Sequence, residues 1–326
     1  MPFKHNKSKR HHFEKPTYRQ SNYAEYNQSL RNRGRIDIWL SDEIMKNWQN
    51  DQRTYDGTGS SPKYPDNTLI ACHYLRLVFK QPLRQTQGFI DSLLKEMGYT
   101  ELRCPDYSSL SKRLSTLGFK TPAFKFTDKP DEGVAAIAID STGLKEFGKG
   151  EWHQEKHGVN GRRSWRKAHF GVGEDHIIHA AVLTDKDTMD FQVVDELCEQ
   201  IEVEIEHVSA DKMYDTDDVY ETLSNEFPDA DIVIPPKDNL YADNHHHPQR
   251  MSNLVAHTAL GPMRWQKEKQ YGKRNVSENA MQRYKTLIGP KLHSRDFDNQ
   301  QQEMMLGASI LNRFTHLGMP DSYRVA

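Results

Sequence analysis

Three carboxylates in this sequence have the chemistry and the placement to hold metal ions. Asp140 follows the apolar run 134–139, and Asp211 follows a second apolar run that ends at Ala210. A carboxylate directly after a core strand is rigidly placed yet reachable from solvent, as a metal ligand must be. A single aspartate in that position more often starts an ordinary turn, but two of them point to a site that needs a third acid.

The third acid is Glu278, which lies in the segment 271–285. If this segment is helical, four residues fall within about 60° of one another around its axis: Tyr271, Arg274, Glu278 and Lys285. The opposite side is apolar and would pack on a sheet. An acid flanked by a tyrosine, an arginine and a lysine suits a metal ligand beside groups that grip phosphate.

The charges of the chain are segregated, although the formal net charge is only −2. Nine Lys/Arg stand against two acids in residues 1–35, and eleven stand against four in residues 237–295. Residues 185–231 hold 17 acids and two lysines. This pattern is expected of a protein that binds a polyanion around a cation-binding centre. Solvated faces of alternating sign are the alternative.

Length and composition exclude several classes of protein. The 326 residues favour two domains. No apolar run approaches the ~20 residues of a membrane span, and the basic N-terminus lacks the apolar stretch of a signal peptide. Three widely spaced cysteines are too few for a disulfide framework or a cysteine zinc site. We therefore expect a soluble, cytoplasmic protein.

The N-terminal part of the chain divides into two segments. Residues 1–40 are basic and polar without a lasting period, which predicts a flexible arm. Within residues 41–120, apolar stripes at helical spacing predict helices over 66–80, 82–98 and 106–117. Lys112 and Arg113 lie on the outer side of the last helix. This arrangement favours a helix-turn-helix-like DNA-binding region. A helical hairpin without DNA contact is the alternative.

The hydrophobic pattern of residues 132–326 differs from that of the N-terminal part. Apolar runs predict strands over 134–139, 165–172, 176–183, 205–210 and 232–234. Helical stripes follow over 190–202, 216–227, 272–288 and 297–317, with a polar loop before the third of these. The expected fold class is α/β, a mixed five-stranded sheet with flanking helices as in a ribonuclease-H-like core.

The acids and their neighbours resemble the bacterial insertion-sequence transposases of the DDE class. Asp140, Asp211 and Glu278 match the three acids, and the residues around Glu278 match the signature Y-x2-R-x3-E-x6-K without deviation. Further stretches resemble the same family: residues 157–169, 210–215 with 234–236, and 295–314. In the helical region, residues 75–79 and 83–89 are similar as well. The resemblance covers about residues 18 to 320.

The resemblance implies a ribonuclease-H-like catalytic domain over 132–326, in which Asp140, Asp211 and Glu278 are catalytic and bind two Mg²⁺, with Mn²⁺ as a substitute. Such ions activate an attacking hydroxyl and stabilise the leaving oxygen. It also implies cleavage and strand transfer at terminal inverted repeats of double-stranded DNA, by a dimer in a synaptic complex associated with the bacterial nucleoid.

Two sets of residues would contact that DNA. By resemblance, Tyr271, Arg274 and Lys285 contact phosphates near the transposon end. A basic loop between the first two strands would add further contacts: Arg162, Arg163, Arg166 and Lys167. A charged hairpin tip is the alternative for this loop. Only 66 residues separate Asp211 from Glu278, which leaves no room for the large β-rich insertion of some relatives.

Three other features invite a functional reading. Asp215 could support the metal site from behind Asp211. Trp265 could stack on an unpaired base, although a buried tryptophan is the more usual case. The run 245–247 is all histidine, but Pro248 follows and no acid partner is evident, so we expect a solvated loop.

Two other functions remain open. A stand-alone metal nuclease on the same fold would need neither end-specific binding nor 3′-hydroxyl joining. A non-catalytic, sequence-specific DNA-binding regulator would keep the fold without needing the acids. The three intact acids favour an enzyme, and the basic arm with the helical region favours a transposase over a simple nuclease.

Overall fold

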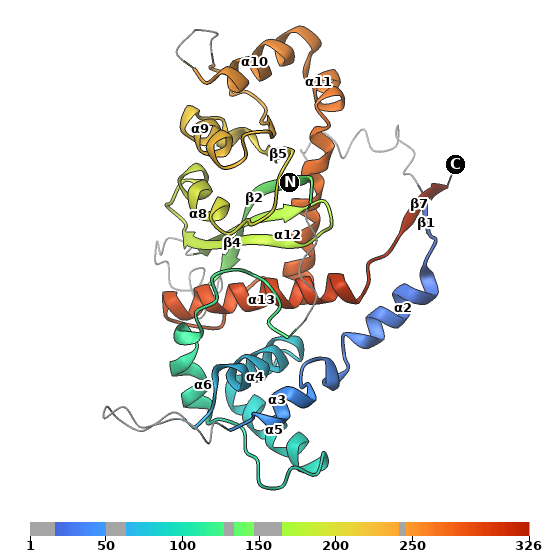
Figure 1. Cartoon of the computed structure of the whole chain (residues 1–326), viewed down its shortest axis with the longest axis vertical. Coiled ribbons are helices and arrows are strands. Elements are labelled where there is room, and N and C mark those ends of the chain that lie inside the picture. Colours follow the sequence, from blue (N-terminus) through green and yellow to red (C-terminus); the bar gives the residue numbers. More distant parts are fainter. Residues whose placement is uncertain (1–16, 50–62, 127–133, 147–164, 241–245, 326) are drawn as a thin grey trace, which may run out of the picture.

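A five-stranded mixed sheet forms the centre of the part of the chain that follows residue 134 (Figure 1). The computed structural model describes residues 17–49, 63–126, 134–146, 165–240 and 246–325. The strands of this sheet are β2 (Ala136–Lys145), β3 (Trp165–Gly173), β4 (Ile178–Asp185), β5 (His207–Ala210) and β6 (Asp231–Val233). Their order is β4-β3-β2-β5-β6, antiparallel from β2 to β4 and parallel from β2 to β6. The expected α/β, ribonuclease-H-like fold class is thereby confirmed.

Helices cover both faces of this sheet because its strands are apolar on both sides. One face packs on the short helix α8 (Val194–Cys198) and on α9 (Asp217–Glu226). The other face packs on α12 (Asn275–Leu287) and on α13 (Phe297–Leu317). The bounds of α13 are those predicted, whereas the helix expected over 190–202 consists of a 3-10 turn, η4 (Asp190–Val193), followed by α8.

The long helix α13 lies between the sheet and the N-terminal helices (Figure 1). These are α3 (Asp42–Lys46), α4 (Asp66–Val78), α5 (Leu83–Glu96) and α6 (Tyr107–Arg113), followed by η3 (Ser115–Leu117). Tyr74 Oη and Ser309 Oγ lie 2.7 Å apart across the α4–α13 contact. One hydrophobic cluster runs from the N-terminal helices through α13 to the sheet, so both regions share a core.

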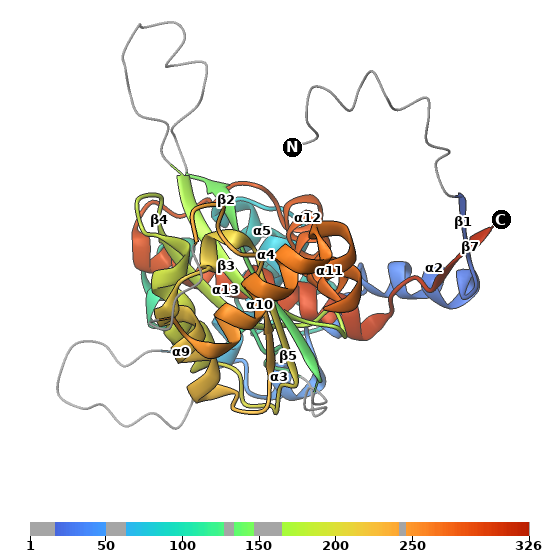
Figure 2. The same ribbon diagram turned by 90° about the horizontal axis from the view of Figure 1, so that it is seen from above.

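The prediction of a flexible arm over residues 1–40 is wrong for residues 17–40, which the structure describes. Strand β1 (Thr17–Gln20) pairs antiparallel with β7 (Ser322–Val325), and α2 (Tyr23–Asn32) follows. Ser21 Oγ donates a 2.7 Å hydrogen bond to Asp321. Figures 1 and 2 show this ribbon extending away from the five-stranded sheet. The partner strand lies about 300 positions away, where no local pattern could point to it. Residues 1–16 lie outside the described residues.

A second difference concerns the polar loop expected before residue 272. It contains two helices, α10 (Pro248–Leu260) and α11 (Pro262–Glu268). Each begins with a proline, which fits the first helical turn because its missing N–H needs no partner there. Among the described helices, none is both long and apolar enough to cross a membrane.

Candidate active site

Asp140 and Asp211 lie at the same level on neighbouring strands. Ile139 of β2 pairs with Ala210 of β5 in parallel register, and each aspartate is the next residue. Neighbouring strands are about 4.8 Å apart. The expectation that Asp140 ends its strand is wrong, because β2 continues to Lys145 along β3. The pairing of β2 with β5 stops at this level, whereas its pairing with β3 continues. Asp140 therefore has a neighbouring strand on one side only.

Glu278 approaches this level from α12. The predicted helix over 272–288 starts later, since residues 271–274 form a 3-10 turn, η6 (Tyr271–Arg274), and α12 begins at Asn275. Glu278 is in the first turn of α12, and its side chain is 57% exposed. The single helical stripe is therefore broken between Arg274 and Asn275, although its residues stay close together.

Arg274 joins two of the acids. Its Nη1 donates a 2.7 Å hydrogen bond to Asp140 Oδ2, and its Nη2 donates to Glu278 Oε1. Ser277 Oγ lies 3.3 Å from the same oxygen of Asp140. Met213 N donates to Asp211 Oδ1 at 2.7 Å, which fixes the third carboxylate. One guanidinium thus stands between a strand carboxylate and a helix carboxylate.

The negative charges of the three acids shift the pKa values of the same neighbouring groups. Burial raises the pKa of Asp140, and the negative charge of Asp211 raises it further, against the opposing charge of Arg274. Burial raises the pKa of Tyr271 to about 12, and all three carboxylates contribute to the rise. Burial alone would lower the pKa of Arg274, but Tyr271 and the three carboxylates raise it. The charges of all three acids therefore act on both Tyr271 and Arg274.

The donor set suits a hard divalent cation, because it consists of carboxylate oxygens. In the part of the chain that the structure describes, no three His, Cys, Asp or Glu side chains are gathered closely enough to hold a metal ion. The spacing of Asp140 and Glu278 is set by the guanidinium between them. The chemistry of the residues thus fits Mg²⁺ or Mn²⁺, while a side-chain cation balances two of the acids.

Tyr271 lies beside Arg274, the partner of two of the acids, and Lys285 lies further along α12. The Tyr271 ring lies under Arg274, 5.7 Å from ring centroid to guanidinium carbon. Lys285 is seven residues after Glu278 on the same helix, about 10 Å along its axis. It is half-buried, and burial lowers its pKa. Trp265 is fully buried, with its ring centroid 5.7 Å from that of Tyr271, so it supports Tyr271 and is not available to stack on a base.

The structure differs from the prediction of a basic loop between the first two strands, because two of its four residues lie in a strand. Arg166 and Lys167 belong to β3, and both have partners. Arg166 Nε lies 2.9 Å from Glu146 Oε1 and 2.9 Å from Gln300 Oε1 of α13. Lys167 Nζ donates to Thr188 O at 2.8 Å. These contacts join β3 to its neighbours. Arg162 and Arg163 lie outside the described residues.

Asp190 is a fourth acid, and it lies near the site. It accepts hydrogen bonds from Ser141 Oγ at 3.0 Å and from Lys167 Nζ at 3.1 Å. Burial raises the pKa of Tyr214 well above its usual value, and Asp190, Asp140 and Asp211 raise it further. The charge of Asp190 therefore acts on the same buried tyrosine as the charges of the two strand acids. Its position after a core strand was the one available signal.

Asp215 holds a loop and does not face the acids. Its carboxylate accepts from Lys237 N at 2.7 Å and from Arg250 Nε at 2.8 Å, so both oxygens are engaged. Arg250 belongs to α10, one of the helices that the sequence did not predict. The prediction of a solvated histidine loop without an acid partner is also wrong at His246, because its Nδ1 lies 2.7 Å from Asp217 Oδ2. His245 lies outside the described residues.

Comparison with known protein families places this geometry in context. Two family models, each described as a transposase DDE domain, match the chain over residues 31–149 and 134–313. The second match spans more than half of the chain and contains Asp140, Asp211 and Glu278. The first covers the N-terminal helices from α3 to α6 and the first of the three acids.

Proposed function

The chain belongs to the transposase DDE domain family, and from that premise we propose that it cuts and joins DNA at the terminal inverted repeats of its own element. The observation that carries this proposal is the strand register that sets Asp140 level with Asp211, together with the contact of one arginine with both Asp140 and Glu278. Asp140 and Asp211 lie at one level of paired strands, and Arg274 links Asp140 to Glu278.

Asp140, Asp211 and Glu278 are the residues that would hold two Mg²⁺ ions, with Mn²⁺ as a substitute. The ions would supply the electrophilic chemistry of an in-line phosphoryl transfer. Arg274 can grip a phosphodiester through two N–H groups, and Lys285 offers a point charge further along the same helix. The Tyr271 ring lies against Arg274, and its raised pKa keeps its hydroxyl protonated as a hydrogen-bond donor.

DNA recognition belongs to the same proposal. Residues 41–120 are the DNA-binding region, residues 132–326 the catalytic domain, and residues 1–40 a basic N-terminal segment. Lys112 on α6 is exposed, whereas Arg113 is tied to Tyr64 O at 2.7 Å and to Asp66. Lys112 is therefore the residue of this pair that suits phosphate contact. The active form is a dimer on paired DNA ends, in the cytoplasm and associated with the nucleoid.

The test uses the full chain, labelled DNA that carries the flanking inverted repeat, and Mg²⁺. We expect cleavage at the repeat boundary, with a free 3′-hydroxyl that joins target DNA. Glu278→Gln, Asp140→Ala and Asp211→Ala should each lower cleavage by at least about a hundredfold, because each removes a metal ligand. Repeat binding should persist, because no phosphate contact is lost.

Glu268→Gln is the matched control, since Glu268 is exposed on α11 and pairs only with its neighbour Arg264 among the described contacts. Its cleavage should equal that of the unaltered chain. Cutting without preference for the repeat would instead identify a metal nuclease. Repeat binding without cutting in Mg²⁺ or Mn²⁺ would identify a DNA-binding regulator. Loss of binding in all three acid variants would contradict the assigned roles.

A further inference from the structure

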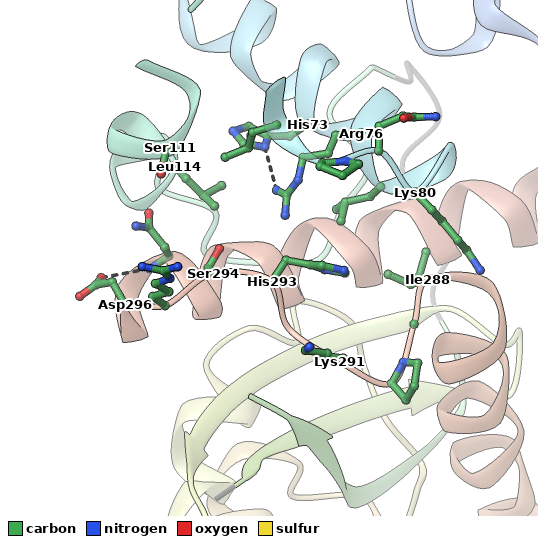
Figure 3. Close-up of a pocket in the computed structure, with 18 residues that line it drawn as sticks. His73, Arg76, Lys80, Ser111, Leu114, Ile288, Lys291, His293, Ser294 and Asp296 are labelled. Carbon is green, nitrogen blue, oxygen red and sulfur yellow. Dashed lines mark hydrogen bonds between the residues drawn. The ribbon is translucent and has the colours of Figure 1, made fainter. Parts of the chain in front are cut away.

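A cavity of about 800 Å³ separates the N-terminal helices from the segment 288–296 (Figure 3). Its lining comes from the end of α4, the start of α5 and the end of α6 on one side, and from the segment before α13 on the other. Ile288, at the far end of α12, lies ten residues after Glu278, or about 15 Å along the helix. The cavity is thus separate from the three acids.

The segment that forms this second wall is anchored to the sheet. Beyond the level of Asp140, the open edge of β2 receives residues 290–292. Lys145 N donates to Pro290 O at 2.9 Å, and Leu292 N donates to Lys145 O at 2.8 Å. The cavity is therefore built between two elements of the rigid core and is of a size typical of ligand sites.

The lining combines positive charge with an apolar wall. Four Lys/Arg line the cavity, against one carboxylate: Arg76, Lys80, Lys291 and Arg295, against Asp296. Asp296 is engaged as the N-cap of α13. Leucine, isoleucine and proline side chains make up much of the remaining wall. In addition, α5 starts at the cavity with Pro82 as its N-cap, without a side-chain cap or an acid in its first turn. The positive end of that helix adds to the field.

Arg76 lines the cavity as a buried cation with two long contacts. The residue is 5% exposed. Its Nη2 lies 3.4 Å from Glu303 Oε1, and its Nη1 lies 3.3 Å from His73 Nδ1 (Figure 3). Glu303 is engaged more closely by the backbone N–H groups of His293 and Ser294, at 2.9 and 2.8 Å. Burial and the charge of Arg76 lower the pKa of His73 to about 3, so this histidine is neutral.

Lys80 stands at the rim in an unusual conformation. Its φ is +52°, in the left-handed region that favours glycine and that few lysines adopt. The turn between α4 and α5 would be formed more easily by glycine, so the turn itself does not require this lysine. Unfavourable backbone conformations are concentrated at functional sites. The exposed ammonium group at the cavity rim is the feature that the lysine provides.

We propose that this cavity binds a nucleotide, with its phosphate on Arg76, Lys80 and Lys291 and its base or sugar against the apolar wall. The volume suits one or two nucleotides and is too small for a double helix. The nucleotide is either free or an unpaired nucleotide of a bound DNA strand. At 3.4 Å of rise per nucleotide, about 15 Å from the acids corresponds to four or five positions. This inference goes beyond the proposed cleavage activity, because it concerns nucleotide binding, which is measured in the absence of cleavage.

The test is a calorimetric titration of the full chain in EDTA at low salt. The probes are deoxyadenosine 5′-monophosphate, deoxyadenosine and a single-stranded tetranucleotide. We expect deoxyadenosine to bind at least about tenfold more weakly than its monophosphate. This factor corresponds to the loss of one hydrogen bond to a charged group. Lys80→Gly and Lys291→Gln should each weaken binding of the monophosphate by about the same factor.

Two controls separate charge from folding. Lys46→Gln removes an exposed lysine outside the cavity, and His176→Gly replaces another residue with positive φ. Neither should change the affinity, and Lys80→Gly should unfold at no lower temperature than the unaltered chain. Displacement of the monophosphate by the tetranucleotide supports a DNA strand as the source, and failure to displace it supports a free nucleotide.

The inference is overturned if neither phosphate-bearing probe binds the unaltered chain, or if the cavity variants bind as well as the controls. Either result would leave the proposed cleavage at Asp140, Asp211 and Glu278 untouched. Conversely, a chain that binds the monophosphate but never cuts DNA would count against the proposed function alone.

Discussion

Arg274 donates a 2.7 Å hydrogen bond to the carboxylate of Asp140, a residue 134 positions earlier in the chain. The same guanidinium reaches Glu278, so the arginine that the sequence suggests as a phosphate contact is also the partner of two acids. Both roles use the same property, a planar group with several fixed donors. Arg274 and these two carboxylates therefore form one electrostatic unit.

The first prediction concerns that unit. Arg274→Ala should weaken binding to the inverted repeat and lower the slope of log affinity against log salt by about one. Lys285→Ala should do the same, but it should leave the acids undisturbed, since none of the described contacts of Lys285 involves them. The measurement is a salt series of binding isotherms for both variants. Unchanged affinity and slope in both would mean that the two cations are structural.

The second prediction separates stability from DNA contact at Arg166. Because its guanidinium pairs with the buried Glu146 and with Gln300, Arg166→Ala should lower the free energy of unfolding by about 3 kcal/mol. Repeat binding at a temperature where the variant is folded should be unchanged. Denaturant unfolding and a binding isotherm decide the matter. Weaker binding at unchanged stability would restore Arg166 as a DNA contact.

The third prediction tests how α13 supports α12. A Cβ on Gly307 would lie 2.6 Å from the hydroxyl oxygen of the buried Tyr284. Gly307→Ala should therefore destabilise the fold by about 1–3 kcal/mol and lower cleavage, because Tyr284 and Glu278 share α12. Gly88→Ala is the matched control: nothing lies within 4 Å of its added Cβ, and alanine favours a helix by about 0.5–1 kcal/mol. A stable, active Gly307→Ala would contradict tight packing here.

The fourth prediction concerns pH. Burial would raise the pKa of Glu303, but hydrogen bonds from His293 and Ser294 and the charge of Arg76 lower it to about 2. Its usual value is 4.5. The unfolded chain takes up the proton first, so this contribution is fully present above about pH 4.5 and is lost as the pH falls towards 2. Stability should decline over that range.

His73 adds to the same decline at higher pH. Its pKa of about 3 in the fold, against 6.5 when unfolded, means that stability already starts to fall below about pH 6.5. Glu303→Gln should be less stable at pH 7 and should lose less stability between pH 4.5 and 2. Thermal unfolding of both proteins across this range is the measurement. Parallel curves would show that Glu303 does not carry the effect.

The sequence predicted most elements because their signals are local. Ser41 caps α3 and Asp106 caps α6, as their positions before apolar stripes suggest. Gly118 ends the third predicted helix with a φ of +63°. The five strands were recognisable as apolar runs, and the position of Asp211 followed directly from the end of its run.

The parts that could not be predicted depend on distant partners. Whether β2 stops at Asp140 depends on how far the hairpin with β3 extends, and not on the residues of β2 alone. Asp190 reaches the site through Ser141, which is 49 positions away. The cavity combines Arg76 with residues more than 200 positions later. Composition and period describe the residues of one segment, whereas these contacts depend on which segments meet.

The pairing of β1 with β7 also orders events during translation. Residues 17–20 leave the ribosome about 300 residues before their partner strand, residues 322–325, exists. At up to about 20 residues per second, β1 spends at least about 15 s of synthesis without a partner. The N-terminal ribbon can therefore form only after all the residues between its two strands, including the five-stranded sheet, have been made.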